Sequence, residues 1–279
     1  MNGLVGPPEL DVLIPTYRRP AALAVTLAGL VAQTMPAFRV VVSDQTDDGP
    51  PSIDAAEVQS VARVLQLTGR DVELHRHLPR RGMAEHRAFL LGLARAPYAL
   101  FLDDDVLCEG DLLARLVRAI RSARCGFVGS GLVGPSFADD QRPDEQAAFE
   151  SWPGNRVEPE VVAPESGPWR RYRLHNAANL HHLRERMEAR TGEAPPDTLY
   201  KVAWIGGCVL YDVAKLRATG GFDFWRDLPA RHAGEDVLAQ LRLMRHHGGA
   251  GLFPSGAYHL ELPTTIPDRE VDAPRVLQS

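Results

Sequence analysis

Short apolar runs alternate with longer amphipathic stretches over the first half of the chain. The short runs predict buried strands, and the longer ones repeat apolar residues three and four apart, as on one face of a helix. The predicted strands are 10–14, 38–43, 72–77, 98–102 and 127–133. The predicted helices are 20–33, 55–67, 83–94 and 111–121. This alternation predicts an α/β fold with a mostly parallel central sheet flanked by helices.

The periodicity weakens over residues 134–199, where Pro, Glu, Arg and Trp are frequent. One helix is predicted there, between Leu174 and Arg190. We interpret the segment as an insertion into the sheet domain. Trp152, Trp169 and Tyr172 lie beside arginines and would suit sugars or anions. A loop that is packed by its own aromatic side chains is an equally good interpretation.

The α/β pattern resumes after the insertion, with a strand predicted over 204–211 and a helix over 235–246. Residues from 263 onward are predicted to form a C-terminal tail. No internal repeat is visible. We therefore expect one domain over 1–279, divided into 10–133, 134–262 and the tail 263–279.

The length, composition and charge of the chain exclude some classes of protein. With 279 residues, 44% hydrophobic content and a net charge of −5, the chain can bury a large core, and its dispersed basic residues exclude a nucleic-acid partner. The three cysteines lack C-x-x-C spacing, which favours reduced thiols. We find no apolar run of about 18 residues and no signal-like N-terminus. We expect a cytoplasmic protein without a membrane span.

Three adjacent carboxylates, Asp103, Asp104 and Asp105, directly follow the predicted strand over 98–102. They repel one another and need a compensating cation, for which a divalent metal is the obvious candidate. Open α/β sheets bind ligands at the carboxyl ends of their strands. A solvated acidic turn before the next helix would explain the same residues. The triplet by itself does not decide between these interpretations.

Polar residues also follow the other predicted strands. They are Pro15, Thr16, Tyr17 and Arg18 after the first strand, Asp44 after the second, and Arg81, Gly82 and Arg87 after the third. Asp44 could accept hydrogen bonds from a base or ribose, and Tyr17 could stack on a base. Gly82 permits close backbone approach, and the arginines could meet phosphates. Taken singly, Asp44 is more often a turn residue and Tyr17 part of a core, but together these groups describe one nucleotide-sized cleft.

A G-x-G-x-x-G motif at 129–134 has the wrong context for dinucleotide binding. No helical periodicity follows it, and no second strand ends in an acid about 20 residues later. Motifs of P-loop proteins, zincins and serine hydrolases are absent from the sequence.

In their order and spacing, these features resemble the family 2 glycosyltransferases with the GT-A fold. The resemblance covers 10–132 and 204–260. Its N-terminal motifs run from Ile14 to Arg19, to Asp44, from Arg81 through Arg87 to Leu93, and from Phe101 to Asp105. Its C-terminal motifs are Gly206-Gly207, Gly220-Gly221-Phe222-Asp223, Gly234-Glu235-Asp236, and Pro254 followed by His259.

The resemblance implies a nucleotide-sugar donor linked to UDP, GDP or dTDP, together with Mg²⁺ or Mn²⁺. The donor-binding residues would be Pro15, Thr16, Tyr17, Arg18, Asp44, Arg81, Gly82, Arg87, Asp103 and Asp104, and the metal ligands Asp105 and His259. The half over 10–133 would bind the nucleotide sugar, and the half over 134–262 would provide the acceptor side and catalysis. Ser43-Asp44-Gln45-Thr46 and His86-Arg87-Ala88 depart from the usual motifs, so the base stays open.

Glycosyl transfer requires a carboxylate base for the acceptor hydroxyl and a Lewis acid for the leaving diphosphate. The resemblance implies Asp236 as the base, with Glu235 beside it, although both acids could simply favour the start of a helix. We assign Trp204, Gly206, Gly207 and Trp169 to the acceptor side. The acceptor would be a carbohydrate, a lipid-linked molecule or a small molecule, and the aromatic insertion could instead form a homodimer interface.

We therefore predict a metal-dependent, inverting glycosyltransferase. A sugar nucleotidyltransferase and a noncatalytic nucleotide-sugar-binding protein are the alternatives. The former should carry a Gly-rich phosphate loop with a Lys near its N-terminus, where this chain has Arg18-Arg19 and no Lys.

Overall fold

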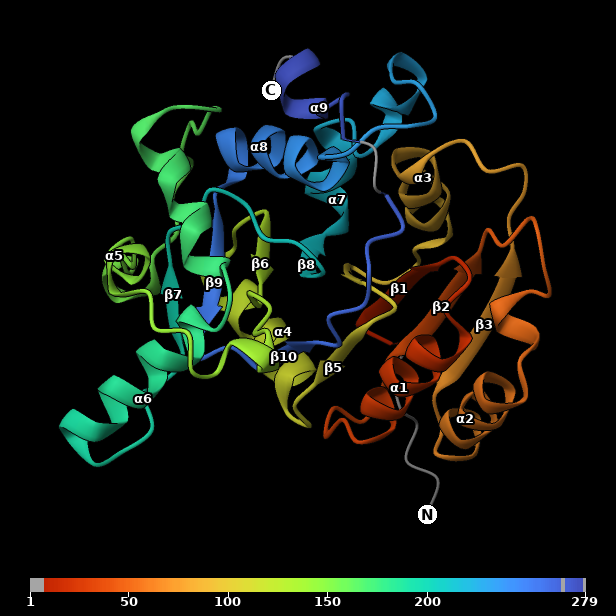
Figure 1. The fold of residues 1–279 in the computed structure, drawn as a ribbon, viewed down its shortest axis with the longest axis horizontal. Helices are drawn as coiled ribbons and strands as arrows, with labels where there is room; N and C mark the ends of the chain where they lie inside the picture. Colours follow the sequence, from red (N-terminus) through yellow and green to blue (C-terminus); the bar gives the residue numbers. More distant parts are fainter. Residues whose placement is uncertain (1–7, 267–268, 278–279) are drawn as a thin grey trace.

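The computed structural model describes residues 8–266 and 269–277, which contain a central sheet of eight strands (Figure 1). Their order across the sheet is β3-β2-β1-β4-β8-β6-β9-β7. In chain order they are β1 (Leu10–Thr16), β2 (Arg39–Asp44), β3 (Asp71–Arg76), β4 (Tyr98–Leu102), β6 (Phe127–Gly129), β7 (Thr198–Tyr200), β8 (Cys208–Asp212) and β9 (Gly249–Phe253).

Most of these strands point the same way. β1 is parallel to β2 and β4, β2 is parallel to β3, and β6 is parallel to β9. β8 runs antiparallel to both β4 and β6, and β7 runs antiparallel to β9. The predicted mostly parallel sheet is confirmed. The reversal at β8 matters for the site, because its first residue, Cys208, pairs with Leu102, the last residue of β4.

Helices cover both faces of the sheet, and the strands are therefore buried on both sides. In β1, Val12 and Ile14 pack on one face, with α1 (Pro20–Val31), α2 (Ala56–Leu67) and α4 (Leu112–Ala123). Leu13 packs on the other, with α3 (Met83–Leu93), α7 (Val213–Ala218) and α8 (Glu235–His247). The predicted stripe of Leu23, Leu27 and Leu30 on the first helix is buried.

A second, two-stranded sheet lies beyond the end of β4. β5 (Val106–Cys108) pairs antiparallel with β10 (Ala257–His259), and His259 is opposite Val106. The sequence pattern predicted neither strand, because three residues are too few to show a period of two. This pairing brings the C-terminal part of the chain next to the acid triplet.

The predicted insertion contains mostly short helices. Its elements are η2 (Pro135–Phe137), α5 (Pro143–Gln146), η3 (Pro153–Asn155), η4 (Gly167–His175) and α6 (Asn179–Thr191). The helix predicted from Leu174 begins later, at Asn179, because residues 167–175 form 3₁₀ turns. β7 follows α6 and adds an edge strand to the central sheet.

Two predicted strands are shorter than expected. The strand over 127–133 ends at Gly129, where the Ser130 hydroxyl lies 3.1 Å from the Ser255 hydroxyl. The strand over 204–211 begins at Cys208, because residues 204–207 form a loop that includes Gly207 at a φ of 75°. Other short helices are η1 (Ser52–Asp54) and η5 (Asp223–Asp227).

The predicted tail over 263–279 contains α9 (Ala273–Val276), which packs against α8 in Figure 1. Its first residue, Ala273, is buried. Residues 267–268 and 278–279 of this tail, like 1–7 of the predicted domain, lie outside the described residues. Within the described part of the chain, every helix is too short or too polar to span a membrane.

Candidate functional site

The polar residues that follow β1, β2 and β4 meet at one edge of the sheet. Thr16 at the end of β1 is in register with Asp44 at the end of β2. β4 lies on the other side of β1, so the acid triplet that follows it emerges at the same edge. The antiparallel β8 starts here, and the Asp103 amide donates to the Gly207 carbonyl over 2.8 Å.

Asp104 is almost completely buried and faces β1. Its Oδ2 accepts a 2.6 Å hydrogen bond from the Thr16 hydroxyl, and its Oδ1 lies 3.2 Å from Nη1 of Arg19. Burial raises the pKa of Asp104 to about 6, although Thr16 and Arg19 both favour its charged form. Both carboxylate oxygens of Asp104 therefore accept hydrogen bonds, one from β1 and one from the turn after it, and these contacts help to hold the triplet against β1.

Asp105 contacts His259, which lies in the C-terminal part of the chain. Its Oδ2 accepts a 2.6 Å hydrogen bond from Nη1 of Arg19 and lies 3.5 Å from Nε2 of His259. Burial opposes ionisation, but His259 and Arg19 together hold the pKa of Asp105 below its ordinary value. The same contact raises the pKa of His259.

Asp103 faces the second half of the chain through Arg87. Nη2 of Arg87 lies 3.2 Å from Oδ1 of Asp103, and its Nε lies 3.0 Å from Oε1 of Glu235. Burial disfavours a charged guanidinium, yet the surrounding carboxylates raise the pKa of Arg87, so it stays cationic. Burial, with the charges of Asp105 and Glu235, raises the pKa of Asp103. Arg87 is thus a buried link between β4 and the start of α8.

Asp236 lies in the first turn of α8, immediately after Glu235. Gly234 precedes them with a φ of 76°, and a Cβ there would come within 2.4 Å of Asp272 Oδ1. The sharp turn into α8 therefore requires glycine. Burial, and then the charge of Glu235, raise the pKa of Asp236 to about 7. A carboxyl group with this pKa can take up a proton near neutral pH.

Two glycines separate Asp103 from Asp236. A Cβ on Gly207 would lie 3.4 Å from Asp103 Oδ2, and one on Gly206 would lie 3.8 Å from Asp236 Oδ2. A larger residue at either position would occupy space next to a carboxylate oxygen. Gly206 and Gly207 thus leave no side chain beside these two carboxylate oxygens.

Aromatic side chains from the insertion pack against the same loop. The rings of Tyr172 and Trp204 are nearly parallel, with centroids 6.5 Å apart, and Trp169 lies 6.5 Å from Tyr172. The indole Nε1 of Trp204 is buried, and no described residue accepts a hydrogen bond from it. The structure therefore brings the predicted acceptor-side residues Trp204, Gly206, Gly207 and Trp169 into one region.

Tyr17 and Arg18 lie on the outer side of the cleft. The Tyr17 hydroxyl donates to Asp48 over 3.3 Å, and Arg80 lies over its ring at 4.1 Å. Arg18 forms an exposed ion pair with Asp48. Arg81 is also exposed. These residues form a polar, partly aromatic rim that a nucleotide could contact.

Several predicted donor-binding residues are instead engaged inside the protein. Asp44 is fully buried, and its two oxygens accept hydrogen bonds from the amides of Thr46 and Ile53 over 2.7 and 3.1 Å. This is the turn role that the sequence analysis gave as the alternative. Pro15 is buried within β1, and Gly82 has the His232 ring where its Cβ would be, at 2.6 Å. Donor binding by these three residues stays a prediction.

Sequence reasoning missed Arg19 as a functional candidate. It contacts both Asp104 and Asp105, and its Nη2 donates to the carbonyl of Pro263. Arg19 belongs to the same sequence motif as Thr16 and Arg18. The position of an arginine in a loop does not indicate which carboxylate it will contact in the folded protein. Its partners lie more than 80 positions away, at a sequence separation of 85 for Asp104 and 86 for Asp105.

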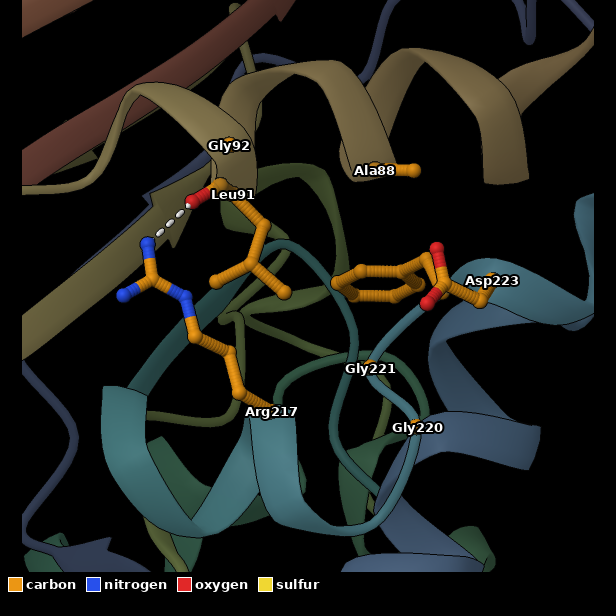
Figure 2. Close-up of a pocket in the computed structure, with 8 residues that line it drawn as sticks. Ala88, Leu91, Gly92, Arg217, Gly220, Gly221 and Asp223 are labelled. Carbon is orange, nitrogen blue, oxygen red and sulfur yellow. Dashed lines mark hydrogen bonds between the residues drawn. The ribbon is translucent and has the colours of Figure 1, made fainter.

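A separate cavity of about 210 Å³ lies between α3 and the turn after α7 (Figure 2). Its lining residues are Ala88, Leu91, Gly92, Arg217, Gly220, Gly221, Phe222 and Asp223. Figure 2 shows Arg217 donating to the Leu91 carbonyl, a bond of 2.9 Å, so its charge is already engaged. No predicted site residue lines this cavity.

Among the described residues, no group of three or more His, Cys, Asp or Glu side chains forms a complete metal site. Asp105 and His259 nevertheless provide an oxygen and a nitrogen 3.5 Å apart, which is close enough for one cation to bind both. Mg²⁺ is commonly bound by one or two protein carboxylates, with substrate phosphates and water completing its shell. The two residues could therefore supply two of the ligands of a divalent cation.

The family of the chain follows from a match to one family model. Residues 11–180, more than half of the chain, match the model of glycosyl transferase family 2. The chain belongs to glycosyl transferase family 2. The resemblance inferred from the motifs is confirmed.

This family 2 protein is also similar to a curated relative. It is 34% identical over 123 residues to the succinoglycan biosynthesis protein ExoM of Rhizobium meliloti (strain 1021), a match that covers 43% of the chain and 37% of ExoM. The chain thus spans well under half of that relative.

Solved structures share its fold. The S. aureus TarS 1–349 structure in complex with UDP-GlcNAc matches with a TM-score of 0.57 and 15% identity, over 92% of the chain and 60% of TarS 1–349. The mannosyltransferase PcManGT from Pyrobaculum calidifontis, in complex with GDP-Man and Mn²⁺, matches with a TM-score of 0.50 and 16% identity, over 88% and 57%. The predicted GT-A-like fold of the family 2 protein is confirmed.

Proposed function

We propose that this chain is a metal-dependent, inverting glycosyltransferase that moves a sugar from a nucleoside-diphosphate sugar to an acceptor hydroxyl. One observation carries the proposal. Arg87 bridges Asp103, after β4, and Glu235, at the start of α8, with contacts of 3.2 and 3.0 Å. This contact supports Asp236, the neighbour of Glu235, as a candidate base near the candidate diphosphate site.

The charge of the cleft explains why a divalent cation would be required. Its carboxylates are those of Asp103, Asp104, Asp105, Glu235 and Asp236. Only the guanidinium groups of Arg19 and Arg87, with the His259 imidazole, offset them among the described residues in contact with these acids. A diphosphate would be repelled by this excess of negative charge. Asp105 and His259 would hold Mg²⁺ or Mn²⁺, which when bound would stabilise the charge on the leaving diphosphate.

Asp236 would act as the general base. The acceptor oxygen forms a bond to the anomeric carbon as the bond from that carbon to the diphosphate oxygen breaks, and the hydroxyl proton passes to Asp236. Glu235 is held by Arg87 and is better suited to position Asp236 than to react itself. Because the pKa of Asp236 is raised to about 7, kcat/KM should rise with pH up to about that value.

The donor would contact the rim formed by Tyr17, Arg18 and Arg81. TarS has been solved with UDP-GlcNAc and PcManGT with GDP-Man, which supports a nucleotide-sugar donor here and leaves UDP, GDP and dTDP open. A carbohydrate, lipid-linked or small-molecule acceptor would lie against Trp204 and Trp169. A cytoplasmic location and a homodimer stay predictions from the sequence.

The proposal is tested by assaying transfer with UDP-, GDP- and dTDP-sugars, with and without Mn²⁺ or Mg²⁺. Asp236→Asn should lower kcat by about 10²- to 10⁴-fold and leave Mn²⁺-dependent nucleotide binding in place, because it removes only the proton acceptor. Asp111→Asn is the matched control, since this carboxylate is 60% exposed at the start of α4. Full activity of Asp236→Asn would exclude this mechanism. Metal-dependent binding without any turnover by the unchanged chain would favour the noncatalytic alternative.

A further inference from the structure

Arg19 is the only side chain described here that contacts two members of the acid triplet through one nitrogen. Its Nη1 lies 2.6 Å from Asp105 Oδ2 and 3.2 Å from Asp104 Oδ1, and the three side chains are 14%, 5% and 7% exposed. Its other terminal nitrogen donates to the Pro263 carbonyl. The guanidinium group is therefore enclosed by oxygen acceptors.

The turn that places Arg19 is unusual. Arg18 has a φ of 57°, in the left-handed region that non-glycine residues seldom adopt, and its amide donates to the Thr46 hydroxyl over 3.0 Å. The chain thus reverses between the end of β1 and the start of α1. Backbone strain of this kind often accompanies functional positions. Here it aims Arg19 at the acid triplet, whereas Arg18 points to Asp48 at the rim.

Arg19 and the candidate metal would compete for the same atom. Asp105 Oδ2, which Nη1 of Arg19 contacts, is also the oxygen that lies 3.5 Å from His259 Nε2. A metal bound by both residues would lie at about 2.0–2.2 Å from each ligand. Two cations so close to one oxygen would repel each other. This repulsion would favour a position of Arg19 farther from Asp105 when a divalent ion binds there.

We propose that Arg19 is a resident counter-ion of the acid triplet, which a divalent cation displaces from Asp105 and which then binds the diphosphate of the donor. A planar guanidinium group matches two phosphate oxygens at once. This role rests on the proposed glycosyl transfer. It makes Arg19 a donor-binding residue whose availability depends on the metal.

The proposal predicts opposite changes in two affinities. Arg19→Met keeps an unbranched apolar stem and removes the charge. Titration with Mn²⁺ alone, followed by calorimetry or electron paramagnetic resonance, should show binding about tenfold tighter than in the unchanged chain, because Asp105 is free. Titration with UDP or GDP at saturating Mn²⁺ should show binding about tenfold weaker, because a phosphate ligand is lost.

Arg18→Met is the matched control for Mn²⁺ binding. It removes the same charge one residue away without touching Asp105, so Mn²⁺ affinity should stay within about twofold of the original. Arg19→Lys keeps the charge and should leave Mn²⁺ affinity closer to the unchanged chain than Arg19→Met does. If Arg19→Met does not fold, as judged by circular dichroism, Arg19→Gln carries the same two predictions.

The outcomes separate this role from the proposed function. Unchanged or weaker Mn²⁺ binding by the folded variant, or unchanged nucleotide affinity, would overturn the role of Arg19 while the glycosyltransferase proposal stands. If the unchanged chain bound neither Mn²⁺ nor any nucleoside diphosphate, the proposed function would fall, and the role of Arg19 with it.

Discussion

At the residue scale, the members of the acid triplet differ because each meets a different partner. Thr16 and Arg19 hold Asp104, Arg19 and His259 hold Asp105, and Arg87 holds Asp103. Adjacent residues in a chain usually share an environment, but here a turn after β4 sends the three side chains toward different elements. Three identical residues can therefore have separate duties.

The ionised carboxylate of Asp236 should destabilise the folded protein. Its pKa is raised from 3.8 to about 7 in the folded state, so the native protein binds more protons than the unfolded chain between these values. Stability is therefore lost as pH rises from about 4 to about 7. Asp236→Asn, which lacks this charge, should melt at a higher temperature than the unchanged chain at about pH 8 and at nearly the same temperature at about pH 4.

Differential scanning calorimetry at both pH values measures this difference. Asp111→Asn, an exposed carboxylate, should show no comparable dependence. A lower melting temperature of Asp236→Asn at the higher pH would mean that the ionised carboxylate stabilises the fold.

At the element scale, the site depends on loops and short strands that join long ones. β5 and β10 have three residues each, yet their pairing carries His259 to the triplet. The loop 204–207 ends just where β8 begins to pair with β4. Sequence periodicity located the long helices and strands, because they repeat a pattern over many residues. Sequence periodicity missed β5 and β10, because each of these strands is stabilised by pairing with the other and is too short to show a pattern of its own.

Gly207 tests the importance of that loop. Its φ of 75° disfavours any other residue, and a Cβ would lie 2.5 Å from Leu132 Cδ1 and 3.4 Å from Asp103 Oδ2. Gly207→Ala should lower the free energy of unfolding by about 1 kcal/mol or more. It should also weaken nucleotide binding, because the loop must shift beside Asp103.

Gly220→Ala is the matched control. Gly220 has a similar φ, 90°, but nothing lies within 4 Å of its Cβ position. Urea denaturation should show a loss of stability in both variants, larger for Gly207→Ala because of the contact with Leu132, whereas nucleotide titration should show a loss of affinity for Gly207→Ala alone. Equal nucleotide affinity in the two variants would remove the loop from the donor site.

At the scale of the whole molecule, Arg87 ties the two predicted halves together. It comes from α3 in the N-terminal half, and Glu235 comes from α8 in the C-terminal half, with side chains that are 7% and 6% exposed. Arg87→Met would leave Glu235 buried without its cation, so we expect a loss of about 3–5 kcal/mol in the free energy of unfolding.

Glu235→Gln in the same background should recover part of that loss, because the Glu235 position then no longer carries a buried charge without its cation. Urea denaturation of the two single variants and the double variant measures the coupling. Additive losses would show that Arg87 and Glu235 do not stabilise each other, and the link between the halves would have to lie elsewhere.

The sequence alone determined the long strands and helices, the acidic end of β4 and the family. Each of these features depends on residues that are close together in the chain and form a periodic pattern, a cluster or a motif. Asp236 and His259 were named through the resemblance to that family, and their roles stay predictions.

Which charged side chains meet depends on the tertiary structure. Arg19 lies 86 positions from Asp105, and Arg87 lies 148 positions from Glu235. In the structure, Asp44 accepts hydrogen bonds from the loop that follows it, and Arg19 contacts the acid triplet. The physical reason is that an ion pair depends on distance in space, and the fold, not the local pattern, sets the distance between residues so far apart in the chain.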